Sequence, residues 1–119
     1  SDQIIREFCA AWGRGEVYVL MDAFADDAVY HNIPMDPATG KDAIRAVIEG
    51  FMKMSPGGVK FEILNQLSSG NLVFNERVDT FVVEGKESGG PVAGVFELDA
   101  DGKIKAWRDY FDMSAFQAG

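Results

Sequence analysis

Residues 59–83 read VKFEILNQLSSGNLVFNERVDTFVV, with apolar and polar side chains alternating on both sides of a short polar interruption. Alternation with a period of two is typical of β-strands. The interruption, Ser69-Gly70-Asn71, has the composition of a hairpin turn. We therefore predict two antiparallel strands, at residues 59–67 and 72–83.

Two further strands are predicted towards the C-terminus. The segment Glu84-Gly85-Lys86 opens a second turn, and the next strand is predicted at residues 92–98, because Gly89-Gly90 loosens its start. A third turn at residues 99–102 leads into a last strand, from residue 103 to about residue 112. Short turns between consecutive strands favour antiparallel pairing.

The N-terminal half has the period of helices instead. Ile4, Phe8 and Trp12 recur every four residues, and Gly13 follows directly, so we predict a first helix that ends there. Residues 17–24 repeat the pattern and predict a second, shorter helix.

A short strand and a third helix complete this half. Residues 28–32 are tolerant of β-structure and precede Pro34, which predicts a strand. Residues 39–42, TGKD, place an aspartate three positions after a threonine, a variant of the capping box. Apolar positions then predict a helix over residues 44–51, ended by SPGG at residues 55–58.

Helices followed by antiparallel strands are typical of the α+β class. The chain has 119 residues, the length of one ordinary domain, so we predict a single domain over residues 1–119. We expect a cone-shaped, curved sheet, mixed or antiparallel, wrapped around three helices, with a deep cavity at its open end.

Composition argues against several kinds of partner and site. The formal net charge of -8 gives the chain no electrostatic reason to bind nucleic acid or an anionic membrane. The single cysteine, Cys9, predicts a reducing compartment, which we take to be the cytoplasm. The single histidine, His31, cannot build a zinc site alone, and no run of apolar residues predicts a membrane span.

Side chains two positions apart on a strand share a face. In the second strand of the hairpin, Arg77, Asp79 and Phe81 point one way. The opposite face carries Phe74 and Val78 and is also mostly apolar, so alternation leaves open which face is buried. A surface ion pair of small energetic value is the alternative interpretation of the charged pair.

Two other strands direct polar groups in the same manner. Trp107, Asp109 and Phe111 share one face of the last strand, and Tyr30 and Asn32 share a face of the strand in the first half. Tyrosine and asparagine before a proline are also common in turns. If the three faces are buried, they enclose polar groups among large aromatic rings.

Such a cluster has a defined chemistry. An arginine between two carboxylates can hold one of them ionised while the other keeps a proton. With Arg77 between them, Asp79 and Asp109 would thus supply a general acid and a general base in one site. Burying the three groups is unfavourable unless they pair with one another.

The remaining motifs are weaker. Met35, Met52 and Met54 are either core filling or an adaptable wall for an apolar ligand. Cys9 lies on the apolar stripe of the first helix and is expected in the core. His31 should point away from the face of its strand that carries the polar pair, which favours a structural role.

Three motifs together resemble those of limonene-1,2-epoxide hydrolases, members of the cone-shaped α+β superfamily typified by nuclear transport factor 2. The motifs are YHNIP at residues 30–34, ERVD at residues 76–79 and GKIKAWRDYFD at residues 102–112. Helical pattern and strand order agree over nearly the whole chain. The N-terminus and the loop around Gly89-Gly90 depart from the family, which affects substrate choice more than chemistry.

The resemblance implies a role for each polar residue. Asp109 would be the base that deprotonates water, and Tyr30 and Asn32 would hold that water from its other side. Asp79 would be the acid that protonates the epoxide oxygen, and Arg77 would bridge the two carboxylates. One water displacement on a strained ring needs an acid on oxygen and an in-line nucleophile, without a metal, a cofactor or a covalent intermediate.

The same resemblance implies a small apolar epoxide as substrate, a vicinal diol as product, and a homodimer. The dimer would form through the outer face of the sheet, where apolar side chains need cover. The residues expected to line the substrate pocket are Phe81, Trp107, Phe111, Phe51, Met54 and Met35.

Two other classes of function stay open on the sequence. A ketosteroid isomerase or polyketide cyclase would use pocket carboxylates and a tyrosine on the same fold, although Arg77 would tend to ionise an acid that has to stay neutral. A non-catalytic binding domain is the other alternative, because fold alone does not separate binding from catalysis.

Overall fold

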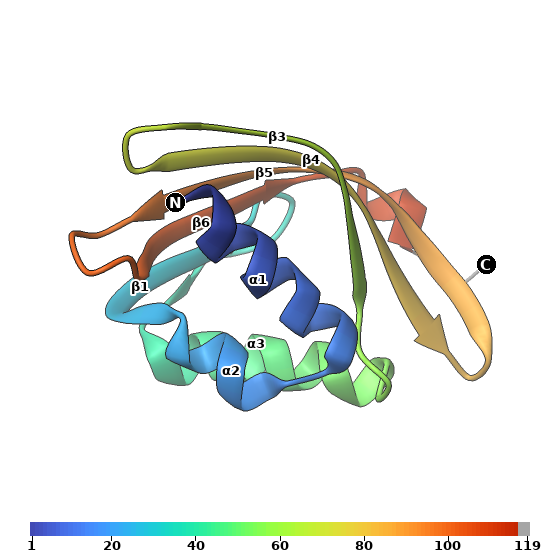
Figure 1. Cartoon of the computed structure of the whole chain (residues 1–119). Helices are drawn as coiled ribbons and strands as arrows, with labels where there is room; N and C mark the ends of the chain where they lie inside the picture. The colour runs from blue at the N-terminus through green and yellow to red at the C-terminus, as the bar shows by residue number, and fades with distance from the viewer. Residues whose placement is uncertain (117–119) are drawn as a thin grey trace.

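The computed structural model describes residues 1–116, which form three α-helices and a six-stranded sheet (Figure 1). No helix in this part of the chain is long and apolar enough to cross a membrane. The elements are α1 (Asp2–Arg14), α2 (Val17–Asp22), β1 (Phe24–Asn32), β2 (Ala38–Thr39), α3 (Lys41–Met54), β3 (Lys60–Ser69), β4 (Leu72–Val83), β5 (Lys86–Leu98), β6 (Ile104–Tyr110) and a 3₁₀-helix, η1 (Met113–Phe116).

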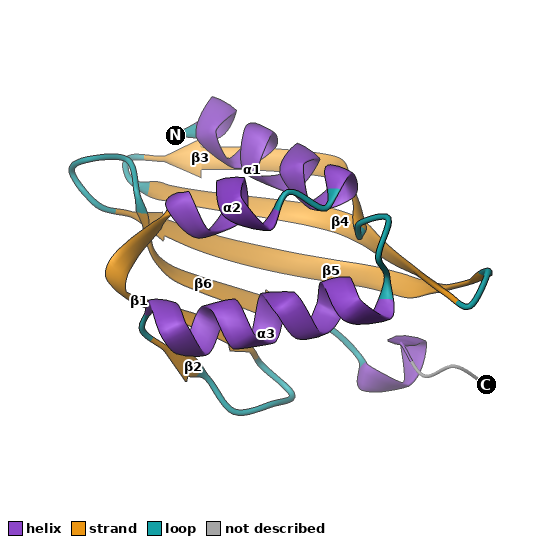
Figure 2. Cartoon of the chain, turned by 90° about the horizontal axis from the view of Figure 1, so that it is seen from below, coloured by secondary structure: helices purple, strands orange, loops and turns teal. Residues whose placement is uncertain are grey.

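The strands form one mixed sheet in the order β2-β1-β6-β5-β4-β3. β1 and β6 are parallel, and the other neighbours are antiparallel. The sheet curves, and the helices cover its concave face, with α1 over β3 and α3 along β1 and β2 (Figure 2). The predicted α+β class with a curved mixed sheet is therefore confirmed.

An aromatic cluster holds α1 against the sheet. The ring of Phe8 packs edge-to-face against Trp107 at 5.1 Å, Phe24 at 5.6 Å, Phe96 at 6.2 Å and Trp12 at 6.5 Å between centroids. Each such pair adds about 0.5–1.5 kcal/mol to the burial of its rings. The predicted apolar stripe of the first helix is thus the inner surface of the core.

The end of α1 is tied to the start of β3. The carbonyl oxygen of Trp12 accepts hydrogen bonds from the backbone N–H of Gly15 and of Val59. Gly58 has φ 112°, and a Cβ atom there would lie 2.8 Å from the Trp12 oxygen, so only glycine fits this close approach. The backbone of Trp12 is therefore held from two sides.

Two strands begin earlier than the sequence predicts. β1 begins at Phe24, which the helical pattern had assigned to the second helix, and that helix ends at Asp22. β5 begins at Lys86 instead of residue 92, because the two glycines that loosen the sequence pattern continue the ladder. Gly89 pairs with Thr80, and the strand is unbroken through it.

The predicted capping box is wrong. Thr39 lies in β2, a two-residue strand that the sequence pattern does not reveal, and pairs with Val29. Gly40 is the N-cap of α3, and no side chain donates or accepts a capping hydrogen bond there. Pairing with β1 thus takes the residue that was expected to cap the helix.

Candidate active site

A buried arginine links two carboxylates from neighbouring parts of the sheet. Arg77 donates from Nε to Asp79 Oδ1 at 2.9 Å and from Nη2 to Asp79 Oδ2 at 2.7 Å. It also donates from Nη1 to Asp109 Oδ1 at 3.2 Å and from Nη2 to Asp109 Oδ2 at 2.7 Å. The guanidinium is fully buried, and the two aspartates are at most 5% exposed. Both carboxylates are thus bound by a two-pronged fork of N–H donors.

The period of β4 and the strand register explain this meeting. Arg77 and Asp79 are two apart on β4, so they share the face that is turned towards the helices. Asp109 on β6 pairs with Gly94 on β5, and Gly94 pairs with Asn75 on β4. The concave face is therefore the buried one, which the alternating pattern alone leaves open.

The far side of the guanidinium is also occupied. Nη1 of Arg77 donates to Asn75 Oδ1 at 3.0 Å, and the ring of Phe61 lies 4.4 Å from the guanidinium carbon. A Cβ atom at Gly94 would lie 2.5 Å from Nη1, so the absent side chain makes room for the arginine. Sequence analysis missed Asn75 and Gly94, although Asn75 shares the face of Arg77 by its spacing.

Trp107 lies behind the cavity instead of lining it. Its side chain is fully buried, and Nε1 donates to Asp109 Oδ1 at 2.6 Å. Its ring stacks on Tyr30 with 4.1 Å between centroids and 6° between planes. The expectation that Trp107 forms the pocket wall is therefore corrected: the indole orients Asp109 and supports Tyr30.

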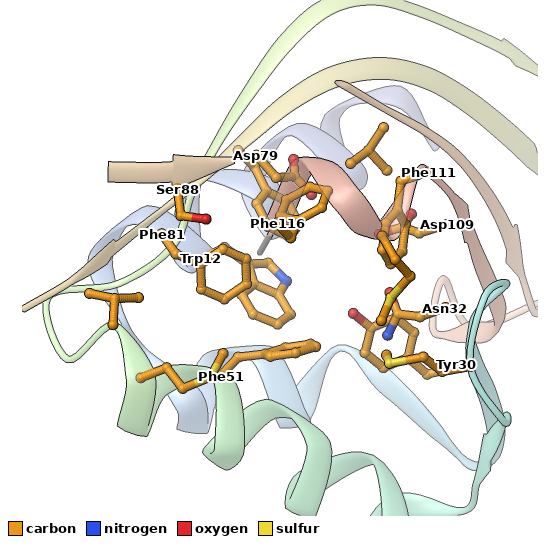
Figure 3. Close-up of a pocket in the computed structure, with 16 residues that line it drawn as sticks. Trp12, Tyr30, Asn32, Phe51, Asp79, Phe81, Ser88, Asp109, Phe111 and Phe116 are labelled. Atoms are coloured by element: carbon orange, nitrogen blue, oxygen red, sulfur yellow. The ribbon is translucent and has the colours of Figure 1, made fainter. Parts of the chain in front are cut away.

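Tyr30 and Asn32 face the cavity from β1. Parallel pairing sets Tyr30 beside Trp107 and Asn32 beside Asp109. Figure 3 shows their side chains on the same side of the cavity as Asp109. His31, between them, lies on the other face of the strand, and its Nε2 is 2.9 Å from the carbonyl oxygen of Met35.

A largely apolar cavity of about 350 Å³ opens in front of these groups (Figure 3). Of the residues predicted to line it, all except Trp107 do so. η1 adds Met113 and Phe116, which follow the last strand and carry no periodic signal in the sequence. The lining residues are Trp12, Tyr30, Asn32, Met35, Phe51, Met54, Phe61, Asp79, Phe81, Val83, Ser88, Val92, Asp109, Phe111, Met113 and Phe116.

Burial dominates the electrostatics of the site. Desolvation raises the pKa of Asp79 to about 6 against the opposing effect of Arg77. Burial lowers the pKa of Arg77, but the charges of Asp109 and Asp79 outweigh it and raise the pKa overall. Burial, together with the charge of Asp109, raises the pKa of Tyr30. Desolvation also raises the pKa of Cys9 to about 12, so this thiol stays protonated.

The geometry suits proton transfer more than metal binding. Within residues 1–116, no cluster of three or more histidine, cysteine or acidic side chains is arranged to hold a metal ion. Asp79 and Asp109 both face the cavity, and the space between them is taken by Arg77. The two carboxyls can therefore act on one small molecule as an acid and a base.

Comparison with known proteins places the chain in a family. The family model described as the SnoaL-like domain matches residues 5–107. The chain belongs to the SnoaL-like domain family. This SnoaL-like chain is 33% identical to epoxide hydrolase EphG of Mycobacterium tuberculosis (strain ATCC 25618 / H37Rv) over 93 residues, or 76% of this chain and 59% of that protein. It thus spans less than two thirds of that relative.

Solved structures agree with this assignment. An M. tuberculosis LEH-like epoxide hydrolase superposes with a TM-score of 0.80 and 29% identity, covering 96% of this chain and 84% of that chain. Bal32a, from a soil-derived mobile gene cassette, superposes with a TM-score of 0.82 and 23% identity over 96% of this chain and 91% of its own. The second likeness concerns the fold alone. The expected relationship of this SnoaL-like domain to epoxide hydrolases is confirmed.

Proposed function

We propose that this protein is an epoxide hydrolase that adds water to a small apolar epoxide in one step and gives a vicinal diol. The observation that carries the proposal is the fork of Arg77 between Asp79 and Asp109, both facing an apolar cavity. The related proteins named as epoxide hydrolases support it.

Asp109 is the base in this mechanism. Its carboxylate accepts from two nitrogens of Arg77 and from Nε1 of Trp107, and these donors fix its orientation and stabilise its charge. Tyr30 and Asn32 lie on the neighbouring strand and supply polar groups on the other side of a water molecule held by Asp109. The water is thereby oriented with one proton towards the base.

Asp79 is the acid. Its raised pKa of about 6 leaves about a tenth of the Asp79 carboxyls protonated at pH 7, against about a thousandth at the ordinary value, and a donor to the epoxide oxygen requires this protonated form. A protonated carboxyl gains from its apolar surroundings, because the neutral form avoids the desolvation penalty. The same burial that disfavours its charge therefore prepares it to donate.

The reaction balances within these groups. The water oxygen bonds to one epoxide carbon while the carbon–oxygen bond at that carbon breaks. The water proton passes to Asp109, and the proton of Asp79 passes to the departing oxygen. Asp109 then returns a proton to Asp79 through solvent, and Arg77 stays charged beside whichever carboxylate is ionised. Attack from the side opposite the leaving oxygen inverts that carbon, as in inverting glycosidases.

The cavity favours a substrate of modest size. A volume of about 350 Å³ lies at the small end of the range for ligand sites, roughly 300–1,000 Å³. Its walls are mainly aromatic rings and methionines, and Asp79 and Asp109 are the acid and the base of the proposed reaction. The proposed reaction therefore needs only the epoxide and water.

The direct test is hydrolysis of a panel of cyclic and acyclic epoxides in water enriched in heavy oxygen. One heavy oxygen should enter the diol, at the attacked carbon. The Asp109→Asn variant should lose roughly two to four orders of magnitude in turnover. Asp101→Asn, in the exposed turn before β6, is the matched control and should keep normal turnover. No diol from any epoxide, or normal diol formation by Asp109→Asn, would contradict the proposal.

We also propose that the protein forms a homodimer through the outer face of the sheet. Leu67 and Phe74 face each other across β3 and β4, and they are 75% and 44% exposed. Val82 and Leu64, on the same two strands, are about half exposed. Apolar side chains gathered on one face are typical of a protein interface.

A further inference from the structure

Two polar atoms in the cavity wall take no part in the proposed reaction. Within residues 1–116, the Nε1 atom of Trp12 and the Oγ atom of Ser88 are buried and have no hydrogen-bond partner. Both residues line the cavity, and Trp12 is completely buried. Buried polar atoms are nearly always paired in folded proteins, so an unpaired one facing a cavity indicates a ligand atom.

The indole of Trp12 cannot turn to find a partner elsewhere. Its ring stacks on Phe61 at 4.7 Å with 12° between planes and contacts Trp107 edge-on at 5.9 Å. Its backbone oxygen is bound to the N–H groups that join α1 to β3. Figure 3 shows the indole nitrogen facing the open centre of the cavity. Helix and ring packing therefore hold this donor in place towards the ligand.

Among the described residues, no atom near this N–H accepts a hydrogen bond from it. Phe51 and Phe61 flank the indole, with Phe51 at 6.2 Å between centroids. Ser88 lies on β5 beside Phe81, so the second unpaired atom is also set in an aromatic wall. A hydrocarbon ligand would leave both atoms unsatisfied, which is unfavourable. An oxygen atom on the ligand would satisfy the N–H.

We propose that Trp12 is a specificity-determining residue whose Nε1–H donates a hydrogen bond to a substrate oxygen other than the epoxide oxygen. The substrate class is then an apolar epoxide that also carries a carbonyl, ether or hydroxyl group. This inference rests on the proposed hydrolase function, in which the epoxide oxygen receives its proton from Asp79. Ser88 is placed to bind the same group or a second polar atom.

A matched pair of compounds tests the proposal. Acetylcyclohexene oxide and isopropenylcyclohexene oxide have the same shape, and differ in that a carbonyl oxygen replaces a methylene group. We expect kcat/KM to favour the acetyl compound roughly tenfold. In Trp12→Phe, which keeps an aromatic ring and removes the N–H, the ratio should fall to about one. Phe51→Leu, which changes the wall without a donor, should leave the ratio as in the wild type.

A spectroscopic measurement separates this proposal from the hydrolase function, because it needs no turnover. The chain has two tryptophans, and Trp12→Phe assigns their indole signals in a proton–nitrogen correlation spectrum. With acetylcyclohexane, the Trp12 signal should move in the direction of hydrogen bonding, and with isopropenylcyclohexane it should not. This selective shift supports the proposed hydrogen bond from Trp12 even if no epoxide is hydrolysed.

Three results would overturn the proposal. One is an equal response of the Trp12 signal to both cyclohexanes. Another is an equal kcat/KM for the two epoxides in the wild type. The third is a strong shift with isopropenylcyclohexene oxide, which would mean that the N–H binds the epoxide oxygen itself. Wild-type selectivity between the two epoxides decides the matter if Trp12→Phe does not fold.

Discussion

Gly94 lies against the guanidinium of Arg77 so closely that a Cβ atom at residue 94 would stand 2.5 Å from Nη1. The same atom would lie 2.8 Å from Asn75 Oδ1 and 2.9 Å from Asp109 Oδ1. The central strand of the sheet thus leaves one position empty, and three polar side chains from its two neighbours meet over it. The geometry of the candidate site therefore requires a residue without a Cβ atom at position 94.

Gly94→Ala should therefore damage the site. The added methyl group has to displace buried side chains, which we expect to destabilise the protein by about 1–3 kcal/mol. Displacing the charged groups by a fraction of an ångström should lower epoxide turnover about a hundredfold. Thermal unfolding and diol formation measure the two effects.

Gly50→Ala is the matched control for that experiment. Gly50 lies within α3, and a Cβ atom there would meet no heavy atom within 4 Å. The change should stabilise the helix by roughly 0.5–1 kcal/mol and leave turnover as it is. Wild-type turnover in Gly94→Ala would show that the site tolerates rearrangement and contradict the close packing.

Arg77→Lys should not preserve function although it preserves charge. Lysine is a point charge on a flexible stem and cannot make two parallel hydrogen bonds to each of two carboxylates. We expect a loss of at least a hundredfold in turnover and about 3 kcal/mol in the free energy of unfolding. Urea denaturation and steady-state kinetics give both quantities.

The conservative change at Arg108 is its control. Arg108 on β6 pairs with Glu97 at 2.6 Å, and both side chains are about one third exposed. Because exposed ion pairs contribute little, Arg108→Lys should change stability by no more than about 0.5 kcal/mol. Similar losses in the two variants would mean that the buried bridge has no special role.

The sequence was sufficient to predict the layout of the fold, because both periods are clear in it. Helical stripes such as that of Phe8 and Trp12 stand apart from the alternation of β4 and β6. What escaped prediction has no period of its own: β2 has two residues, and η1 has four. Gly89 and Gly90 made the predicted start of β5 too late, because their pairing with β4 depends on residues distant in the sequence.

The candidate site was predictable where spacing alone determines a shared face. Arg77 and Asp79 on one strand follow from their separation by two, but their contact with Asp109 depends on the register of β5 between them. Gly94 is the β5 residue that pairs with Asp109, and a glycine carries no side chain whose chemistry would indicate a site. Trp12 fits an ordinary core stripe, and only the three-dimensional structure reveals its unpaired N–H.

Phe74→Glu should separate the proposed dimer. The side chain is 44% exposed in the single chain and pairs with Leu67 on the outer face, close to the turn between β3 and β4. A charge there meets its own copy or an apolar neighbour across the interface, and both contacts are unfavourable. Light scattering at micromolar concentration should change from a dimer to a monomer of 13.0 kDa.

Tyr18→Glu controls for the loss of an exposed aromatic residue. Tyr18 lies on α2, in the helix layer on the opposite side of the sheet, and is 86% exposed. Its variant should remain as dimeric as the wild type. A wild-type protein that scatters as a monomer would disprove the dimer proposal.

The acid of the proposed mechanism predicts a pH dependence of turnover. Since burial raises the pKa of Asp79 to about 6, the free enzyme loses the catalytic proton as pH rises past that value. The ratio kcat/KM should therefore fall about tenfold per pH unit above the pKa of Asp79. A pH profile of diol formation on one good substrate measures this limb, and a flat profile up to about pH 9 would exclude Asp79 as the acid.

The same shift predicts how stability depends on pH. The folded state holds the Asp79 proton more tightly than the unfolded chain, whose aspartate titrates near the ordinary value of 3.8. Below that value Asp79 is protonated in both states, so its ionisation does not change the free energy of unfolding. As pH rises from 3.8 towards 6, only the unfolded state ionises, so the free energy of unfolding falls by about 1.4 kcal/mol per pH unit, roughly 3 kcal/mol in total.

Asp79→Asn removes this pH-dependent contribution to the free energy of unfolding. The difference between the variant and the wild type therefore reports on Asp79 and not on the other carboxyls of the chain. Relative to the wild type, the variant should gain about 3 kcal/mol between about pH 4 and about pH 7, because it has no proton to lose. Urea denaturation of both proteins at the two pH values gives the difference directly. Asp101→Asn, in the exposed turn before β6, should show no such gain. If the wild type and Asp79→Asn kept a constant difference across this range, Asp79 would be ionised throughout it, and another group would have to supply the proton to the epoxide oxygen.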